Sequence, residues 1–125
     1  MRRVRLSGRV ASGKGDLKGW MEHHRAAYER ATGEALIPGS LNVILDQPWV
    51  VKAPPMRLEA SEIGVGMNIL PCEIGGVPAF VLRTDRNNSG LGDHATNVVE
   101  FAASVHLRQV LGLRDGDRVE VVLPD

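Results

Sequence analysis

Pro38-Gly39-Ser40-Leu41-Asn42-Val43 is the stretch that decides the fold of this chain. The Pro-Gly pair predicts a turn, because proline presets φ and glycine tolerates the conformations that close a turn. The apolar run that follows, Leu41 to Leu45, has the composition and length of a buried strand. Because side chains alternate along a strand, Ser40 and Asn42 are expected on one face, opposite Leu41 and Val43.

The oxygens of Ser40 and Asn42 are therefore expected side by side at the mouth of this turn. Such a neutral pair suits Mg²⁺, which prefers oxygen ligands and usually keeps waters and substrate phosphates as its other ligands. The second interpretation is a turn into a half-buried strand whose polar face meets water. The six residues taken alone favour this second interpretation.

The composition is that of one ordinary globular domain spanning residues 1–125, with 43% hydrophobic and 24% charged residues. A chain of this size buries roughly two thirds of its unfolded surface. The 15 basic and 15 acidic residues cancel, so no overall field attracts nucleic acid or a membrane, and neither is expected as a partner. The single cysteine excludes an internal disulfide and fits a reducing compartment. With no signal peptide or membrane span in the sequence, we expect a cytoplasmic protein, either a monomer or a weak homo-oligomer.

The pattern of apolar residues predicts a mostly β protein, a small closed barrel of about six strands with one longer and one short helix. Helical periodicity begins at Trp20 and ends at Gly33, where a C-terminal cap belongs. Two segments are expected to be loops, 12–19 and 84–95, and a third, 46–55, to cross the surface in irregular conformation. The expected strands are 3–11, 40–45, 67–74, 77–83, 96–103 and 118–123, with 56–60 as a further candidate for a short strand, and the expected helices are 20–32 and 105–111.

Two further features carry candidate chemistry. The glycine- and lysine-rich segment 12–19 can turn backbone amides towards an anion, although a solvated turn is the more common role of such a sequence. Glu100 lies in an apolar strand and shares a face with Val98 and Ala102, so its burial is expected. A buried carboxylate must find hydrogen-bond donors or raise its pKa. The pair Arg83-Thr84 either reaches a ligand or is a strand end that meets water.

Taken together, these stretches resemble the CTP-dependent riboflavin kinases known from archaea. Segment 12–18 resembles the Ser-Gly-x-Gly-x-Gly-Lys loop of that family, and segment 33–43 resembles its Gly-x-x-x-x-Pro-Gly-Thr-Leu-Asn-Val motif. Arg83-Thr84 resembles an Arg-Thr pair of the family. Segment 100–121 resembles its C-terminal motif, Glu-x-x-Ala-Pro-x-x-Leu-Arg-x-x-Leu-x-Leu-x-x-Gly-Asp-x-Val-x-Val. The likeness covers nearly the whole chain, and segment 46–80 contributes little.

The resemblance implies a six-stranded cradle-loop (RIFT-like) barrel and an enzyme that transfers the γ-phosphate of CTP to riboflavin, giving FMN and CDP. It implies that Ser40 and Asn42 hold Mg²⁺ and that Thr84 and Glu100 contact the flavin. Glu100 is then the candidate to orient or deprotonate the attacking hydroxyl. The nucleotide-binding residues that it implies are Lys14, Gly15, Asp16, Leu17, Lys18 and Gly19, together with Val105, His106, Leu107 and Arg108.

The sequence departs from the family pattern at several positions. Leu17 replaces the third glycine of the loop, Gly19 replaces an aromatic residue, and Ser104 stands where the family has proline. These departures leave open a barrel that binds flavin or nucleotide without catalysis. The C-terminal segment also resembles swapped-hairpin barrels that act as DNA-binding regulators, a function that the zero net charge disfavours.

Overall fold

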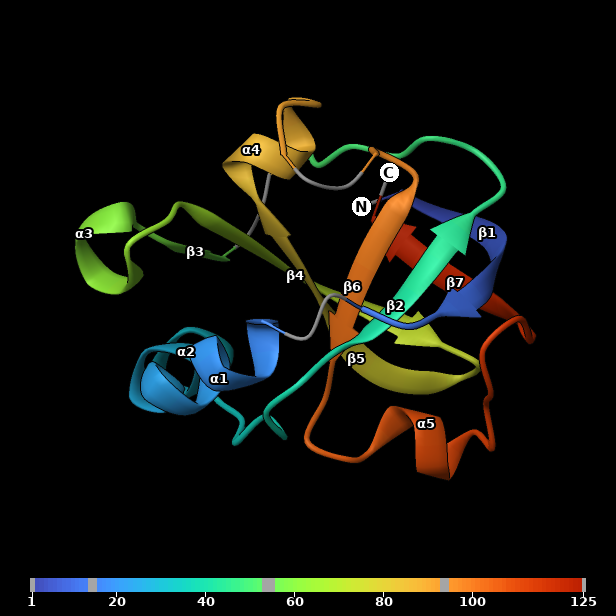
Figure 1. Cartoon of the computed structure of the whole chain (residues 1–125), viewed down its shortest axis with the longest axis horizontal. Coiled ribbons are helices and arrows are strands. Elements are labelled where there is room, and N and C mark those ends of the chain that lie inside the picture. Colours follow the sequence, from blue (N-terminus) through green and yellow to red (C-terminus); the bar gives the residue numbers. More distant parts are fainter. Residues whose placement is uncertain (1, 14–15, 53–55, 93–94, 125) are drawn as a thin grey trace.

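The computed structural model describes residues 2–13, 16–52, 56–92 and 95–124. Its described strands form one antiparallel sheet in the order β3-β4-β5-β6-β2-β1-β7, and an additional pairing between β4 and β7 closes the last six into a barrel. The predicted barrel is thus confirmed, and β3 lies outside it (Figure 1). The strands are β1 (Arg3–Ala11), β2 (Leu41–Leu45), β3 (Met56–Leu58), β4 (Met67–Ile74), β5 (Val77–Thr84), β6 (Val98–Ala102) and β7 (Arg118–Pro124).

The strands were largely predictable because their side chains alternate with period two. The hairpin of β4 and β5 turns at Gly75 and Gly76, whose φ values of 56° and 82° match the left-handed conformation that a tight two-residue hairpin requires. Strand ends differ from prediction by one or two residues, as in β6, which spans 98–102 rather than 96–103. Residues 59 and 60 leave the predicted strand, because Glu59 caps a helical turn there.

The helices differ more from prediction than the strands do. The described part of segment 12–19 is not all loop, since residues 16–19 already belong to a helix, and the predicted helix 20–32 is split at His24, whose φ of −108° and ψ of 26° are not helical. The predicted end is confirmed, because Gly33 adopts φ 75° and its amide bonds Glu29 O. The helices are α1 (Asp16–His23), α2 (Arg25–Thr32), α3 (Ala60–Ile63), α4 (Asp85–Asn88) and α5 (Leu107–Val110).

Two clusters of buried apolar side chains organise the molecule. The first fills the barrel and includes Val43, Val81 and Phe101, each with 0% exposure. The second lies on the outer face of β4, β5 and β6, where α1, α2, α3 and β3 cover it (Figure 1). Leu17 of α1 packs against this second cluster. This partial burial of Leu17 favours a helix that begins before the periodic segment.

The segment after β2 does not merely cross the surface, as the sequence suggested, because Trp49 and Val51 are buried in the barrel cluster. Trp49 Nε1 donates to Pro124 O at 3.2 Å. Arg83 is 2% exposed, and its guanidinium lies 5.3 Å from the centre of the Trp49 ring. Its nitrogens donate to the backbone oxygens of Trp49, Thr96 and Val98. Arg83 therefore joins three segments of the chain, and its burial rules out the alternative in which its side chain meets water.

Arg83→Met is expected to destabilise the protein by about 2–5 kcal/mol. Three backbone carbonyls lose a charged hydrogen-bond donor, and those that stay buried cannot bond to water instead. Urea unfolding followed by circular dichroism measures this loss. Arg5→Met is the matched control, since Arg5 makes an exposed pair with Glu120, and little change is expected there. Equal stabilities for the two variants would contradict the structural role of Arg83.

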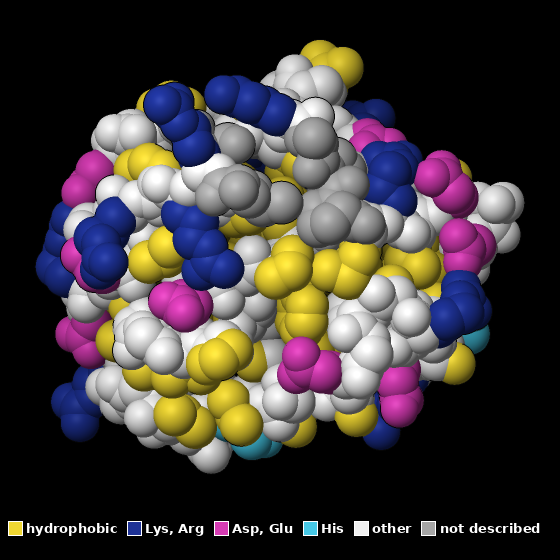
Figure 2. Space-filling view, turned by 180° about the vertical axis from the view of Figure 1, so that it is seen from behind, with side chains coloured by type: hydrophobic (Ala, Val, Ile, Leu, Met, Phe, Trp, Pro, Cys, Tyr) yellow, Lys and Arg dark blue, Asp and Glu magenta, His cyan; other side chains and the backbone are white. Residues whose placement is uncertain are grey.

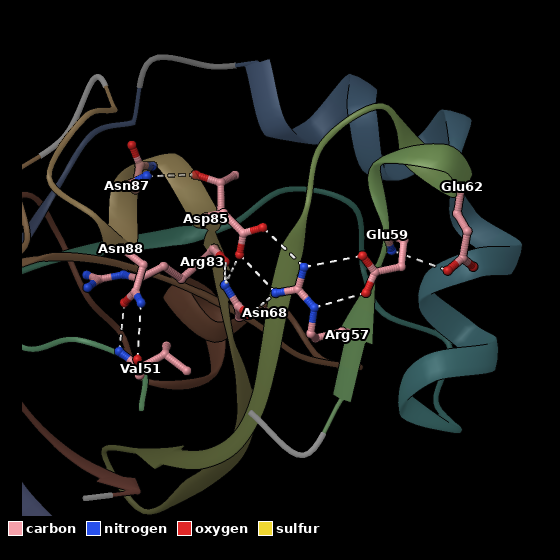
Figure 3. Close-up of polar contacts among 10 residues, drawn as sticks. Val51, Arg57, Glu59, Glu62, Asn68, Arg83, Asp85, Asn87 and Asn88 are labelled. Carbon is pink, nitrogen blue, oxygen red and sulfur yellow. Dashed lines mark hydrogen bonds and ion pairs between the residues drawn. The ribbon is translucent and has the colours of Figure 1, made fainter. Parts of the chain in front are cut away.

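A second polar network fixes β3 and α4 against the barrel (Figure 3). Arg57 donates to both carboxylate oxygens of Asp85 at 2.9 and 3.1 Å, and to Glu59 at 3.0 Å. Asn68 donates to Asp85 at 2.9 Å and to Arg83 O at 3.0 Å. These contacts lower the pKa of Asp85, chiefly through the hydrogen bond from Arg57. The predicted loop 84–95 thus opens with an anchored helical turn.

The surface carries both signs of charge. Figure 2 shows the face opposite to that of Figure 1, on which basic and acidic side chains are interspersed with small hydrophobic areas. No described helix is long and apolar enough to cross a bilayer; α1 and α2 have eight residues each.

Candidate functional site

The candidate site lies on the outer face of β2 and β6, beside the helical cover. Asn42 and Glu100 are direct partners in the register of these two strands, and Leu82 of β5 is the partner of Glu100 on its other side. Alternation sends Val43, Val99 and Phe101 into the barrel. Asn42 and Glu100 therefore both point away from the barrel interior. The sequence predicted the alternation of each strand, whereas the pairing of the two strands comes from the structure.

Asn42 fits the role of a metal ligand. Asn42 is only 4% exposed, and its buried Oδ1 has no hydrogen-bond partner among the described residues. Gly13 makes room for this amide, because a Cβ on Gly13 would lie 2.2 Å from Asn42 Nδ2. Ser40 is exposed and lies two residues before Asn42, beyond the buried Leu41. A buried amide oxygen and an accessible hydroxyl two residues apart are ligand types that suit Mg²⁺.

Glu100 is half-buried, as the sequence predicted. Burial raises its pKa, and the positive charge of Arg83 partly opposes this shift. Burial also lowers the pKa of Arg83 to about 10, a shift that the negative charge of Glu100 opposes in turn. A carboxylate with a raised pKa is a stronger base than a solvated one, so Glu100 has the character expected of a proton acceptor.

A pocket of about 250 Å³ opens next to Ser40. One wall is the segment 37–41, and the other runs from the end of β6 into α5. A hydrogen bond of 2.8 Å from Ile37 N to Ala103 O holds the two walls together. In Figure 1 both segments run below the barrel, where α5 also lies. The lining residues include four of the predicted nucleotide-binding residues, Val105, His106, Leu107 and Arg108.

The second predicted nucleotide-binding segment reaches the same place only in part. The stem of Lys18 lies beside Gly39, because a Cβ on Gly39 would lie 3.9 Å from Lys18 Cβ. Leu17 is turned towards the outer apolar cluster, and Gly19 lies exposed in α1. Asp16 begins α1. Lys14 and Gly15 lie outside the described residues.

Thr84 lies on the same outer face of β5 as Leu82, the register partner of Glu100, and two residues further along the strand. Its Oγ1 accepts a hydrogen bond of 3.1 Å from Asn87 N and caps α4. A hydroxyl that accepts one bond can still donate its own proton. The structure thus gives Thr84 a role in capping α4, and no acceptor for its own proton is seen among the described residues.

Two residues that the sequence did not single out for the site belong to this region. Asp115 accepts from Arg108 Nη1 at 2.9 Å and from Ser12 Oγ, so it connects the pocket wall to the segment before α1. Tyr28 of α2 is 2% exposed, and burial, with the negative charge of Glu100, raises its pKa. In the sequence, Asp115 is accounted for by the turn 115–117, and Tyr28 by the apolar face of a helix. Only contacts between distant parts of the chain could show that they belong to the site.

The fold and these side chains define a small β-barrel protein with a candidate polar site on two neighbouring strands and a pocket at one end. Comparison with known proteins gives the family. The family model described as "Domain of unknown function DUF120", with the short name CTP-dep_RFKase, matches residues 10–123. The chain therefore belongs to the CTP-dependent riboflavin kinase family, which confirms the resemblance seen in its motifs.

Curated relatives carry the name riboflavin kinase. A relative from Pyrobaculum islandicum is 34% identical over 94% of this chain and 59% of its own length. One from Methanocella arvoryzae is 32% identical over 94% of this chain and 56% of its own length, and one from Ignicoccus hospitalis is 30% identical over 96% and 71%. The chain thus spans less than two thirds of the length of the first two of these relatives.

Proposed function

We propose that this chain transfers the γ-phosphate of CTP to the 5′-hydroxyl of riboflavin, giving FMN and CDP. The observation that carries the proposal is the buried oxygen of Asn42, which bonds no described residue and belongs to the register partner of Glu100. A metal ligand and a candidate base are thereby neighbours on one face, which is the arrangement that phosphoryl transfer to an alcohol needs. The family membership and the names of the relatives support the choice of substrates.

Ser40 and Asn42 would hold Mg²⁺ through their side-chain oxygens. When bound, this ion would neutralise negative charge on the phosphate oxygens. Lys18, whose stem lies beside Gly39, would bring a positive charge to the same phosphates. In this proposal the pocket walls at 37–41 and 105–108 receive the cytidine end, and segment 14–19 borders the phosphates.

Glu100 and Thr84 would bind the ribityl end of the flavin from the outer face of β5 and β6. Glu100 accepts the proton of the attacking hydroxyl, and its raised pKa suits that role. Thr84 donates its hydroxyl proton to a flavin oxygen while it continues to cap α4. Positioning and charge neutralisation provide most of the catalysis in such a reaction, so no covalent intermediate with the protein is required.

The test is an assay of FMN formation from riboflavin with Mg²⁺ and, separately, CTP, ATP, GTP or UTP. FMN formation with a preference for CTP is the expected result. A folded protein that forms no FMN with any of the four nucleotides, yet binds riboflavin, would overturn catalysis in favour of a binding function. FMN formation with ATP preferred would overturn the choice of donor alone.

Asp115→Asn is expected to weaken nucleotide binding, because Asp115 pairs with Arg108 of the pocket wall and with Ser12 before α1. The contact is exposed, so we expect the KM for CTP to rise by about two- to fivefold and the KM for riboflavin to stay unchanged.

Glu120→Gln is the control for this experiment, because it neutralises an exposed carboxylate that pairs with Arg5 and lies away from the pocket. It should change neither KM. An equal rise of both KM values in Asp115→Asn would contradict a role of Asp115 on the nucleotide side.

A further inference from the structure

Two buried side-chain polar atoms have no hydrogen-bond partner in the described part of the chain: Asn42 Oδ1 and the hydroxyl of Tyr28. The proposed metal accounts for the first. The second remains unexplained, although Tyr28 is 2% exposed and thus well removed from water. A buried polar group without a partner costs roughly 1–3 kcal/mol, so a tyrosine here is unfavourable unless something bonds its hydroxyl.

The surroundings of Tyr28 explain the position of its ring but not the presence of its hydroxyl. The ring packs in the outer apolar cluster, whose members include Phe80, Leu82 and Ala102. Phenylalanine would meet this packing need equally well, because its ring is the same size. The packing therefore explains the ring and does not explain the hydroxyl.

The hydroxyl belongs to the same region as the candidate site. Leu82 and Ala102 of the cluster share the outer face with Glu100, which is the register partner of Leu82 and lies two residues before Ala102. Burial, together with the negative charge of Glu100, raises the pKa of Tyr28. Tyr28 therefore keeps its proton at neutral pH and can donate a hydrogen bond.

We propose that the Tyr28 hydroxyl is a binding contact for the flavin substrate and donates a hydrogen bond to a hydroxyl oxygen of its ribityl chain. An alcohol both donates and accepts, so one ribityl hydroxyl can donate to Glu100 and accept from Tyr28. The bound alcohol would satisfy the phenol that is otherwise unpartnered. This inference rests on the proposed function, because it takes riboflavin as the ligand.

Tyr28→Phe removes the hydroxyl and keeps the ring. We expect the Kd for riboflavin, measured by quenching of flavin fluorescence on binding, to rise about tenfold. We expect the KM for riboflavin to rise with it, whereas the KM for CTP stays unchanged. The Tm without ligand should stay equal or rise, because the variant no longer buries an unpaired hydroxyl.

Thr32→Val is the matched control on the same helix. It removes a hydroxyl that bonds Tyr28 O at 2.8 Å and Glu34 O at 3.1 Å. We expect this control to lower the Tm and to leave the Kd for riboflavin unchanged.

The outcomes separate this inference from the proposed function. If the wild-type protein binds riboflavin and Tyr28→Phe binds it equally well, Tyr28 is not a flavin contact and the proposed function stands. A lower Tm for Tyr28→Phe with an unchanged Kd would likewise overturn the inference in favour of a buried structural hydrogen bond. If the wild-type protein itself binds no riboflavin, the proposed function fails and the inference fails with it.

Discussion

Asn42→Ala is expected to abolish most of the phosphoryl transfer activity while leaving the protein folded. The variant loses the buried oxygen that we assign to the metal, so kcat should fall by more than the roughly 10–100-fold that loss of a residue supporting a metal ligand costs. Stability should change little, because Asn42 Oδ1 bonds no described residue. Rates of FMN formation over a range of Mg²⁺ concentrations, together with thermal unfolding, measure both effects.

Two further variants make this experiment decisive. Asn42→Asp keeps an oxygen at the same position and should recover part of the activity, although its charge lies opposite Glu100. Asn97→Ala removes an asparagine whose side chain donates to Leu45 O at 3.3 Å, at the other end of β2, and should stay active. Full activity of Asn42→Ala would refute the metal assignment.

Glu100→Gln is expected to lower kcat by about 10²–10⁴-fold, the usual contribution of a general base. Glutamine keeps the size of the side chain and removes its ability to accept a proton as a carboxylate. Glu22→Gln, on the exposed face of α1, is the control and should keep normal activity. Normal turnover by Glu100→Gln would show that Glu100 is not the base.

The pH dependence of the wild-type protein tests the same residue in another way. Burial raises the pKa of Glu100, and only the ionised form can accept a proton. As the pH falls, kcat/KM should therefore decline with a midpoint above the value of about 4.3 that an unperturbed glutamate has. A decline centred at or below that value would contradict the assignment.

The contribution of Glu100 to the free energy of unfolding should change with pH in the direction opposite to kcat/KM. Between the ordinary glutamate pKa and the raised pKa of Glu100, the folded protein binds more protons at this site than the unfolded chain does. The contribution of Glu100 to the free energy of unfolding therefore decreases as the pH rises through this window. Glu100→Gln removes the effect, so at neutral pH the variant should be at least as stable as the wild-type protein, as urea unfolding at several pH values would show.

Side-chain alternation along each strand explains the part of the site that the sequence predicted. The alternation of Leu41, Asn42 and Val43 determines that Asn42 leaves the barrel interior, whichever strand pairs with β2. Glu100 could be placed on its face in the same way. The sequence did not show how β2 and β6 pair. Asn42 and Glu100 are 58 positions apart in the chain, and only the β2–β6 pairing brings them together.

The wrong predictions have a common cause. Residues 16–19 carry no helical periodicity, and the structure makes them helical because Leu17 gains burial against a cluster formed mainly by distant residues. Trp49 was expected on the surface, and it is buried in the barrel cluster near Arg83. In both places tertiary packing outweighs the local preference of the chain.

The sequence by itself determined the features that depend on backbone preference and side-chain period: the strands, the Gly75-Gly76 hairpin, the end of α2 at Gly33 and the faces of Asn42 and Glu100. Its motifs also pointed to the correct family. Only the tertiary structure decided which polar groups come together, including the contact of Asp115 with Arg108, and which are buried, including the Tyr28 hydroxyl. The physical reason is that burial and electrostatic environment come from residues far apart in the chain, which no local pattern encodes.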